Sequence, residues 1–308
     1  MFLLRCLRHV VVLCAVLCVV FGLVACKGSL KDTPIDDNGE SVQLNRVGES
    51  NGSGSLIASA SEFPVRPNQR KGVYLLMGQS NMVGAGNLDD LPEDFPVNGS
   101  HLFVLNDEGG LEFAEYPLQD AGVGPGVAFA DAVYSEYPYL DIGLVSCAVG
   151  GSLIDQWYPD SSVDTFYGNC LQQIRVAMES AELLGVLWYQ GESDSSSMEL
   201  VQSWADKFKF MIKTLRTDVG ISNLPISYAQ LAIVDPETGW DEAFPMWDEM
   251  KMEQELMAAE LQNDHVTMIR TDDLSIKSDG VHLDTASELE VGRRFATEMV
   301  YYLTSDFY

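Results

Sequence analysis

The stretch Val73-Tyr74-Leu75-Leu76-Met77-Gly78-Gln79-Ser80-Asn81-Met82 indicates the fold of this chain. Its apolar run predicts a buried strand, which breaks at Gly78, and Ser80 follows at the predicted start of a helix. This arrangement places a hydroxyl at the carboxyl edge of a parallel sheet, where open α/β sheets bind their ligands. The start of a helix also offers unpaired backbone N–H groups, which suit an anionic intermediate. The alternative is an ordinary strand–turn–helix connection in which Ser80 only caps the helix.

Short apolar segments alternate with longer amphipathic segments from residue 71 onward. This alternation predicts parallel βαβ units and therefore an α/β fold, a three-layer α/β/α sandwich around a parallel five-stranded sheet. The predicted strands are 73–77, 101–105, 142–147, 185–189 and 226–231, with a possible sixth at 266–269. The predicted helices are 126–137, 165–184, 198–219, 244–261 and 285–303.

The first residues are typical of an export signal. Arg5 and Arg8 precede an apolar run that is too short for a membrane span. The run ends in Leu23-Val24-Ala25-Cys26, which resembles a bacterial lipoprotein box. We therefore expect a signal at 1–25 and a lipid on Cys26 that anchors an exported protein to a bacterial cell membrane, on its periplasmic or surface side. A plain signal peptide cut nearby is the alternative.

The segment that follows is rich in small polar residues and has few large apolar ones. Such a composition cannot bury enough surface to order itself, so we interpret residues 26–70 as a flexible tether. Residues 71–308 then form the globular domain.

Charge and cysteine content narrow the function classes. The chain has 46 acidic and 18 basic residues, with a formal net charge of −28. This balance argues against nucleic acid, anionic lipid or polyanionic substrates as partners.

Three of the six cysteines lie in the signal and a fourth is Cys26, which leaves Cys147 and Cys170. We expect these two to be buried free thiols, although an oxidising compartment also permits a bridge between them.

The sequence Asp279-Gly280-Val281-His282 lies near the other end of the chain. Its spacing in a tight loop lets the carboxylate accept a hydrogen bond from one imidazole nitrogen and leaves the other nitrogen free as a base. A serine becomes an effective nucleophile when such a base takes its proton. Ser80, His282 and Asp279 are therefore the predicted catalytic residues.

Two further predicted strands end in groups that suit an oxyanion. Residues 147–152 contain the pair Gly150-Gly151, whose backbone can approach a ligand closely. A backbone N–H from this turn and that of Ser80 are candidate donors, and the side chain of Gln190 is a candidate third. Just beyond Gln190, Glu192 and Asp194 are placed to orient His282 or neighbouring loops, or are simply solubilising loop residues.

Taken together, four blocks resemble the SGNH hydrolase superfamily, and within it carbohydrate esterase family 6 and the sialate O-acetylesterase-like domain. The blocks are Gly78-Gln79-Ser80-Asn81-Met82, Gly124-Pro125-Gly126 leading to 147–151, Trp188-Tyr189-Gln190-Gly191-Glu192-Ser193-Asp194, and Asp279-Gly280-Val281-His282-Leu283. The resemblance implies a flavodoxin-like sandwich and a serine esterase that removes acetyl groups from carbohydrates without metal or cofactor.

Transferred to this chain, the resemblance makes Ser80 the nucleophile, His282 the base and Asp279 its partner. It places Ser80, Gly151 and Gln190 in the oxyanion hole, with Asn81 and Asp194 as supports behind the reacting groups. The superfamily's usual third block has an asparagine after the glycine, whereas this chain has Glu192. Glu192 is thus a possible second carboxylate for His282.

The last block is closer to the xylan-type esterases than to the sialate type. Hydrolysis of sialate acetyl esters, and of lipid or thioester acyl chains, are the alternative enzymatic functions. A tethered glycan-binding protein without catalysis is the non-enzymatic alternative. Trp157 and Trp240 lie in loops that are candidates for bordering the site.

Overall fold

The computed structural model describes residues 69–95, 99–106, 109–119, 121–234, 238 and 240–305. The predicted signal at 1–25, Cys26 and nearly all of the predicted tether lie outside these residues. No helix within the described ranges is long and apolar enough to cross a membrane.

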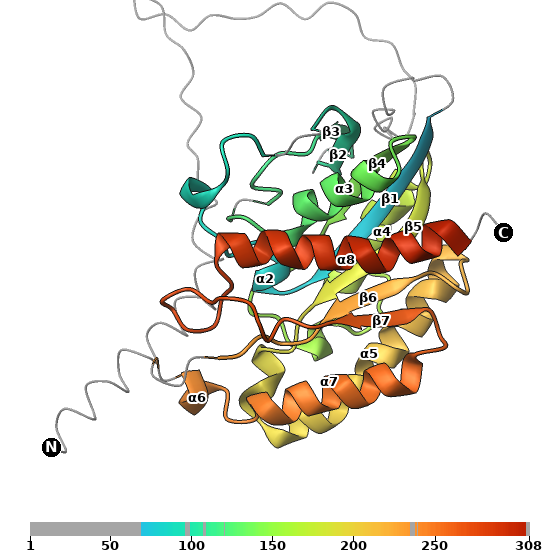
Figure 1. The fold of residues 1–308 in the computed structure, drawn as a ribbon. Coiled ribbons are helices and arrows are strands. Elements are labelled where there is room, and N and C mark those ends of the chain that lie inside the picture. Colours follow the sequence, from blue (N-terminus) through green and yellow to red (C-terminus); the bar gives the residue numbers. More distant parts are fainter. Residues whose placement is uncertain are drawn as a thin grey trace, which may run out of the picture. The chain divides into compact units, whose positions relative to one another are not determined.

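A seven-stranded sheet forms the centre of the domain, in the order β3-β2-β4-β1-β5-β6-β7 (Figure 1). All neighbouring strands pair in parallel except β3, which is antiparallel to β2. The residues of β1 and β5 are mostly apolar and are buried on both faces of the sheet, as expected for strands that helices cover on either side. The strands are β1 (Arg70–Gly78), β2 (Leu102–Leu105), β3 (Leu111–Phe113), β4 (Leu140–Ser146), β5 (Glu182–Tyr189), β6 (Ile226–Ala229) and β7 (Val266–Ile269).

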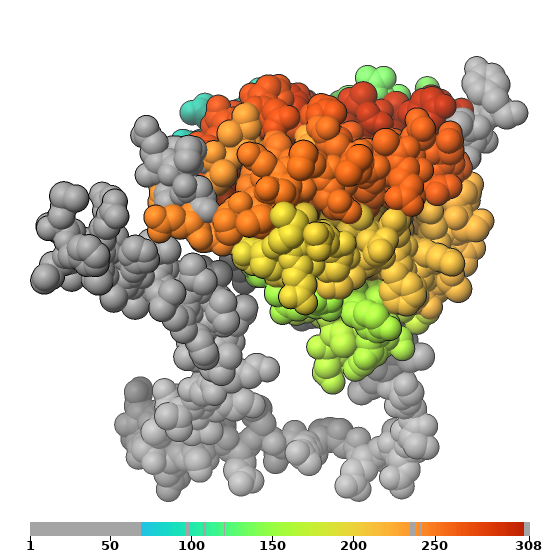
Figure 2. Space-filling view, turned by 90° about the horizontal axis from the view of Figure 1, so that it is seen from below, coloured from blue at the N-terminus to red at the C-terminus, as the bar shows by residue number. Residues whose placement is uncertain are grey.

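Helices cover both faces of the sheet (Figure 1). On one face α8 packs across α3, and on the other lie α4, α5 and α7. The helices are α2 (Ser80–Val83), α3 (Pro125–Glu136), α4 (Phe166–Ala177), α5 (Met198–Val219), α6 (Trp240–Ala243), α7 (Trp247–Leu261) and α8 (Thr285–Ser305). Short 3-10 helices span Leu88–Asp90, Gly99–His101, Ile154–Trp157 and Ser193–Ser196. In Figure 2, α5 (yellow) and α7 (orange) lie side by side on the surface.

The predicted α/β sandwich is confirmed, and the possible sixth strand at 266–269 is present as β7. The five-strand prediction is too small, because it also missed β3. That strand has three residues, and two of them are exposed, so no buried apolar run marks it. The predicted helix 165–184 is too long, since α4 ends at Ala177 and β5 already begins at Glu182.

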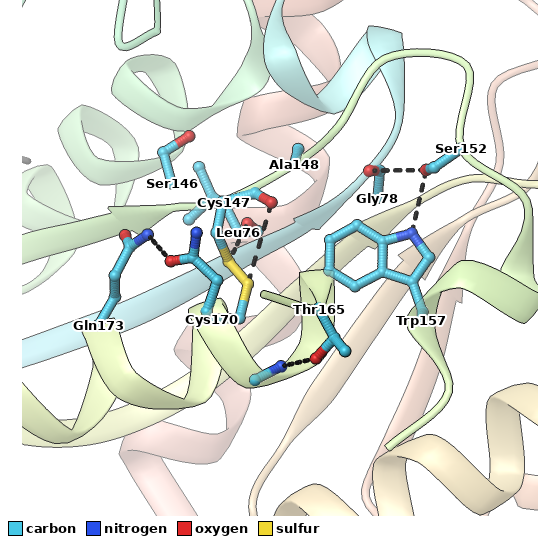
Figure 3. The surroundings of a disulfide bond; sticks show 12 residues. Leu76, Gly78, Ser146, Cys147, Ala148, Ser152, Trp157, Thr165, Cys170 and Gln173 are labelled. Atoms are coloured by element: carbon cyan, nitrogen blue, oxygen red, sulfur yellow. Dashed lines mark hydrogen bonds between the residues drawn. A yellow bond between two sulfur atoms is a disulfide. The ribbon is translucent and has the colours of Figure 1, made fainter. Parts of the chain in front are cut away.

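A disulfide joins Cys147 to Cys170, so the expectation of two free thiols is wrong (Figure 3). Cys147 directly follows β4, and Cys170 lies in the second turn of α4, with a Cα–Cα distance of 5.7 Å. This distance lies within the range that a disulfide requires. The crosslink holds the start of the Ala148–Ser152 turn against the helix layer.

Candidate active site

Ser80 stands where β1 ends, as the first residue of α2. Gly78 turns the chain with φ +133°, and a side chain at this position would collide with the carbonyl oxygen of Tyr189. The next backbone N–H, that of Gln79, donates to the same carbonyl at 2.8 Å. The exit of β1 is thereby pressed against the exit of β5, and Ser80 is lifted to the carboxyl edge of the sheet.

His282 approaches Ser80 from the loop between β7 and α8. Its Nε2 lies 2.9 Å from Ser80 Oγ, and its Nδ1 lies 3.1 Å from Asp279 Oδ2. The other carboxylate oxygen, Asp279 Oδ1, accepts the backbone N–H groups of Val281 and His282 at 3.1 and 3.0 Å. The structure thus brings the three predicted catalytic side chains together in one chain of hydrogen bonds.

The protonation pattern of this chain follows from its partners. Partial burial raises the pKa of Asp279, but the two backbone N–H groups and the imidazole outweigh burial and leave that pKa below its ordinary value. An ionised carboxylate only accepts hydrogen bonds, so His282 Nδ1 donates to it. In the neutral imidazole Nε2 then accepts the Ser80 hydroxyl proton, as a general base requires.

The Ala148–Ser152 turn lies beside the exit of β1. The backbone N–H of Val149 donates to the Gly78 carbonyl at 2.9 Å. The Ser152 hydroxyl donates to the same carbonyl at 3.4 Å (Figure 3). Between them, Gly151 is exposed with φ +68°. Within the described part of the chain, the backbone N–H groups of Ser80 and Gly151 donate to no acceptor. Both are therefore available to a ligand.

Trp157 supports this turn from inside. It is fully buried, packs on Trp188 at 5.4 Å between ring centroids, and donates from Nε1 to Ser152 Oγ at 3.0 Å. Its expected position at the border of the site is therefore wrong. Trp240 is partly exposed, stacks on Phe244 and donates from Nε1 to the backbone carbonyl of Asp279.

Gln190 lies behind the site rather than in it. Its amide nitrogen donates to the Ser152 carbonyl at 2.9 Å and to Asp194 Oδ2 at 2.5 Å, while its oxygen accepts from Trp204 Nε1 at 2.8 Å. Since both amide hydrogens are used, the geometry does not support the predicted role of Gln190 as a third oxyanion donor. Asp194 also accepts the backbone N–H of Ile154 at 3.0 Å, so this buried pair ties the exit of β5 to the chain beyond Gly151.

Glu192 reaches the histidine loop through Asn81. The Asn81 amide donates to Glu192 Oε1 at 2.9 Å and accepts the backbone N–H of Leu283, the residue after His282, at 3.1 Å. Burial raises the pKa of Glu192 to about 7, although the hydrogen bond from Asn81 opposes the rise. The carboxylate that contacts the His282 ring is therefore that of Asp279, whereas Glu192 contacts the histidine loop only through Asn81.

Three residues of the site were not singled out in the sequence. Gln79 Oε1 accepts the backbone N–H groups of Gly191 and Ser193 at 3.3 and 3.4 Å, and so connects the first block to the third. Glu288 is fully buried in α8 and accepts the Ala85 N–H at 3.4 Å, and burial holds its pKa well above the ordinary value. Lys277 contacts both Ala85, in the segment after Ser80, and the loop that carries His282.

Comparison with known families now identifies the chain. The family model described as carbohydrate esterase, sialic acid-specific acetylesterase matches residues 70–301. The chain belongs to this family. The family assignment makes it a hydrolase of the carbohydrate acetylesterase class and agrees with the SGNH-type resemblance of its sequence blocks.

Known relatives support the assignment. The esterase is 31% identical over 257 residues to a probable carbohydrate esterase of Arabidopsis thaliana, covering 76% of this chain and 91% of the plant protein. The X-ray structure of that plant protein matches with a TM-score of 0.65 at 28% identity, covering 78% of this chain and 99% of the other.

Two more distant structures share the fold. A carbohydrate acetylesterase from Xanthomonas citri matches with a TM-score of 0.56 at 23% identity, covering 76% of this chain and 57% of its own. NanS matches with a TM-score of 0.57 at 17% identity, covering 78% of this chain and 100% of its own.

Proposed function

We propose that this esterase removes O-acetyl groups from carbohydrates through an acetyl-enzyme on Ser80. The observation that carries the proposal is the hydrogen-bond chain from Ser80 Oγ to His282 Nε2 at 2.9 Å and from His282 Nδ1 to Asp279 Oδ2 at 3.1 Å. This geometry supplies a nucleophile, a base and a group that orients the base.

In the first half of the reaction, Ser80 Oγ attacks the acetyl carbonyl carbon while His282 Nε2 takes the hydroxyl proton. The carbonyl oxygen becomes an oxyanion, and the free N–H groups of Ser80 and Gly151 are the donors that stabilise it. Asp279 stabilises the imidazolium that forms. The ester bond to the sugar then breaks, and His282 returns the proton to the departing sugar oxygen.

In the second half, water attacks the acetyl-enzyme. His282 takes a proton from the water, and the tetrahedral intermediate is held by the same two backbone donors. The bond between the acetyl carbon and Ser80 Oγ breaks, the serine oxygen recovers its proton from His282, and acetate leaves. The proton transfers in both halves run through His282 Nε2, which already lies 2.9 Å from Ser80 Oγ.

The charge of the site favours an uncharged acetylated sugar, as in xylan, over an acetylated sialic acid. Ser80, Gly151, Gln190, Asp279 and His282 lie in four loops, which span residues 79–87, 148–157, 190–197 and 275–284. Across these loops the only lysine or arginine is Lys277, and it already donates to a backbone carbonyl at 2.7 Å. A sialic acid brings a carboxylate toward the ionised Asp279, in loops whose one lysine is already engaged. Repulsion from Asp279 and the lack of a partner for the added charge disfavour such a substrate.

A substrate panel tests the proposal. Acetate release is measured on acetylated xylan, on O-acetyl sialic acid, and on nitrophenyl esters of increasing acyl length. We expect release from acetylated xylan, weaker release from the sialic acid ester, and kcat/KM that falls as the acyl chain lengthens. Fastest turnover of long acyl chains would instead indicate a lipid or thioester hydrolase, and glycan binding without acetate release would indicate a non-catalytic protein.

We further propose that Cys26 is lipidated and that residues 26–70 tether the domain to a membrane. The lipoprotein-like box and the polar segment after it support this proposal. In cells given a labelled fatty acid, the full-length chain should carry label and sediment with membranes, and Cys26→Ser should do neither. Equal labelling of the two proteins would contradict the proposal.

A further inference from the structure

Lys277 connects the two segments that carry the reacting side chains. Its Nζ donates to the carbonyl oxygen of Ala85 at 2.7 Å, just beyond the short helix that begins with Ser80. The same Nζ lies 3.8 Å from Asp279 Oδ2, and the backbone N–H of Lys277 donates to the His282 carbonyl at 2.7 Å. One residue therefore touches the serine segment, the carboxylate and the histidine loop.

Both backbone polar groups of Ala85 form hydrogen bonds with side chains of the C-terminal part of the domain. Its N–H donates to Glu288 Oε1 of α8 at 3.4 Å, while its carbonyl oxygen accepts from Lys277. Nearby, Thr285 Oγ1 donates to the carbonyl of Asn87 at 2.8 Å. Three hydrogen bonds thus connect the segment that carries Ser80 (residues 79–87) to the C-terminal part of the domain. Of the three side chains involved, that of Lys277 also contacts the catalytic carboxylate of Asp279.

Asp279 Oδ2 faces two cationic or potentially cationic groups, the Lys277 ammonium and the His282 imidazole. The Lys277 side chain is 35% exposed, so its ion pair with Asp279 adds at most about 1 kcal/mol to folding. Its contacts with the Ala85 carbonyl and with Asp279 Oδ2 instead fix the position of the Ser80 segment relative to Asp279 and His282. A shift of about 1 Å between reacting groups can cost about 100-fold in rate.

We propose that Lys277 is a positioning residue of the esterase reaction. Its ammonium group holds the Ser80 segment against the histidine loop and restrains the Asp279 carboxylate, without touching substrate. This inference rests on the proposed esterase function. It also assigns the one lysine of the site loops to the enzyme's own geometry rather than to an anionic group of the substrate.

The test compares Lys277→Met and Lys277→Arg with the wild type, on nitrophenyl acetate and on O-acetyl sialic acid. Lys209→Met is the matched control, because Lys209 also joins two elements, α5 and α7, through Glu260 at 3.1 Å, and its side chain is 27% exposed. We expect Lys277→Met to lower kcat about 10- to 100-fold on both esters while KM changes less than about 2-fold. Lys277→Arg should recover most of kcat, and Lys209→Met should keep it unchanged, with thermal midpoints close to that of the wild type for all three variants.

Three results would overturn the role of Lys277. They are wild-type kcat in a folded Lys277→Met variant, no recovery by Lys277→Arg, and a rise in KM confined to the sialic acid ester, which would identify an anion-binding lysine. The proposed esterase function fails separately, because it requires acetate release by the wild type, which is measured first in the same assay.

Discussion

His282 Nε2 lies 2.9 Å from Ser80 Oγ, although 202 positions separate the two residues in the chain. The serine is delivered by the central strand β1, and the histidine by the loop that precedes the last helix. Parallel strands place both exits at the same edge of the sheet. The candidate active site therefore depends on the completed sheet and cannot form within any one βαβ unit.

Asp279→Asn and Glu192→Gln should have very different effects. The asparagine disturbs the tautomer of the His282 ring and should lower kcat by about 10³- to 10⁴-fold. The glutamine keeps an oxygen that accepts from Asn81, so we expect kcat within about 10-fold of the wild type. The double variant should match Asp279→Asn alone. A Glu192→Gln variant as inactive as Asp279→Asn would show that Glu192 is a direct partner of His282.

The free energy of unfolding should decrease as pH rises, and this decrease should be smaller in Glu192→Gln. Burial raises the folded-state pKa of Glu192 to about 7, while an unfolded glutamate has a pKa near about 4.3. The folded state therefore binds the proton of Glu192 more tightly than the unfolded state does. The contribution of Glu192 to the free energy of unfolding is lost as pH rises from the unfolded-state pKa through the folded-state pKa.

Urea unfolding at pH 5 and pH 7.5 measures the effect. From pH 5 to 7.5 the wild type should lose on the order of 2 kcal/mol more unfolding free energy than Glu192→Gln. Asp194 and Glu288, whose pKa values burial also raises, titrate in both proteins, so the comparison isolates Glu192 together with its repulsion of these two carboxylates. Identical pH dependence would contradict a protonated Glu192 in the fold.

The Cys147–Cys170 disulfide should stabilise the domain. The crosslink spans a sequence separation of 23 residues, for which the loop-closure entropy amounts to about 3 kcal/mol. A Cys147→Ala, Cys170→Ala double variant should unfold at correspondingly lower denaturant concentration. The wild type unfolded in reductant should lose a similar amount, whereas the variant should not respond to reductant. Equal stability of the two proteins without reductant would rule out a structural bridge.

Gln190→Leu should damage stability more than catalysis. It would leave Asp194, the Ser152 carbonyl and Trp204 Nε1 without their buried partner, and each lost partner costs about 1–3 kcal/mol. Denaturant unfolding should show this loss, while kcat of the folded fraction falls less than about 10-fold. If stability is kept and kcat drops about 100-fold or more, Gln190 is an oxyanion donor after all.

The sequence predicts the architecture and the positions of Ser80, Asp279 and His282 because local patterns encode them. A strand broken by Gly78 places the serine, and a three-residue spacing joins Asp279 to His282. The direction of the Gln190 amide is not local, because Trp204, Ser152 and Asp194 set it from three other segments. The disulfide is also non-local, since the spacing of Cys147 and Cys170 does not show that the end of β4 and α4 face each other.

Lys277 and Glu288 were missed for a related reason. A lysine two residues before Asp279 is typical of an exposed loop, and an acidic residue in the first turn of a helix favourably meets the helix dipole. Their contacts with Ala85 become visible only when the N-terminal and C-terminal parts of the domain are assembled.

The most direct test of the central claim is acetate release by Ser80→Ala. The variant removes one oxygen from a turn whose backbone is fixed by Gly78 and Tyr189, so its circular dichroism and thermal midpoint should match the wild type. We predict that its kcat on nitrophenyl acetate and on acetylated xylan falls at least about 10³-fold. Wild-type acetate release from the folded Ser80→Ala protein would contradict the account.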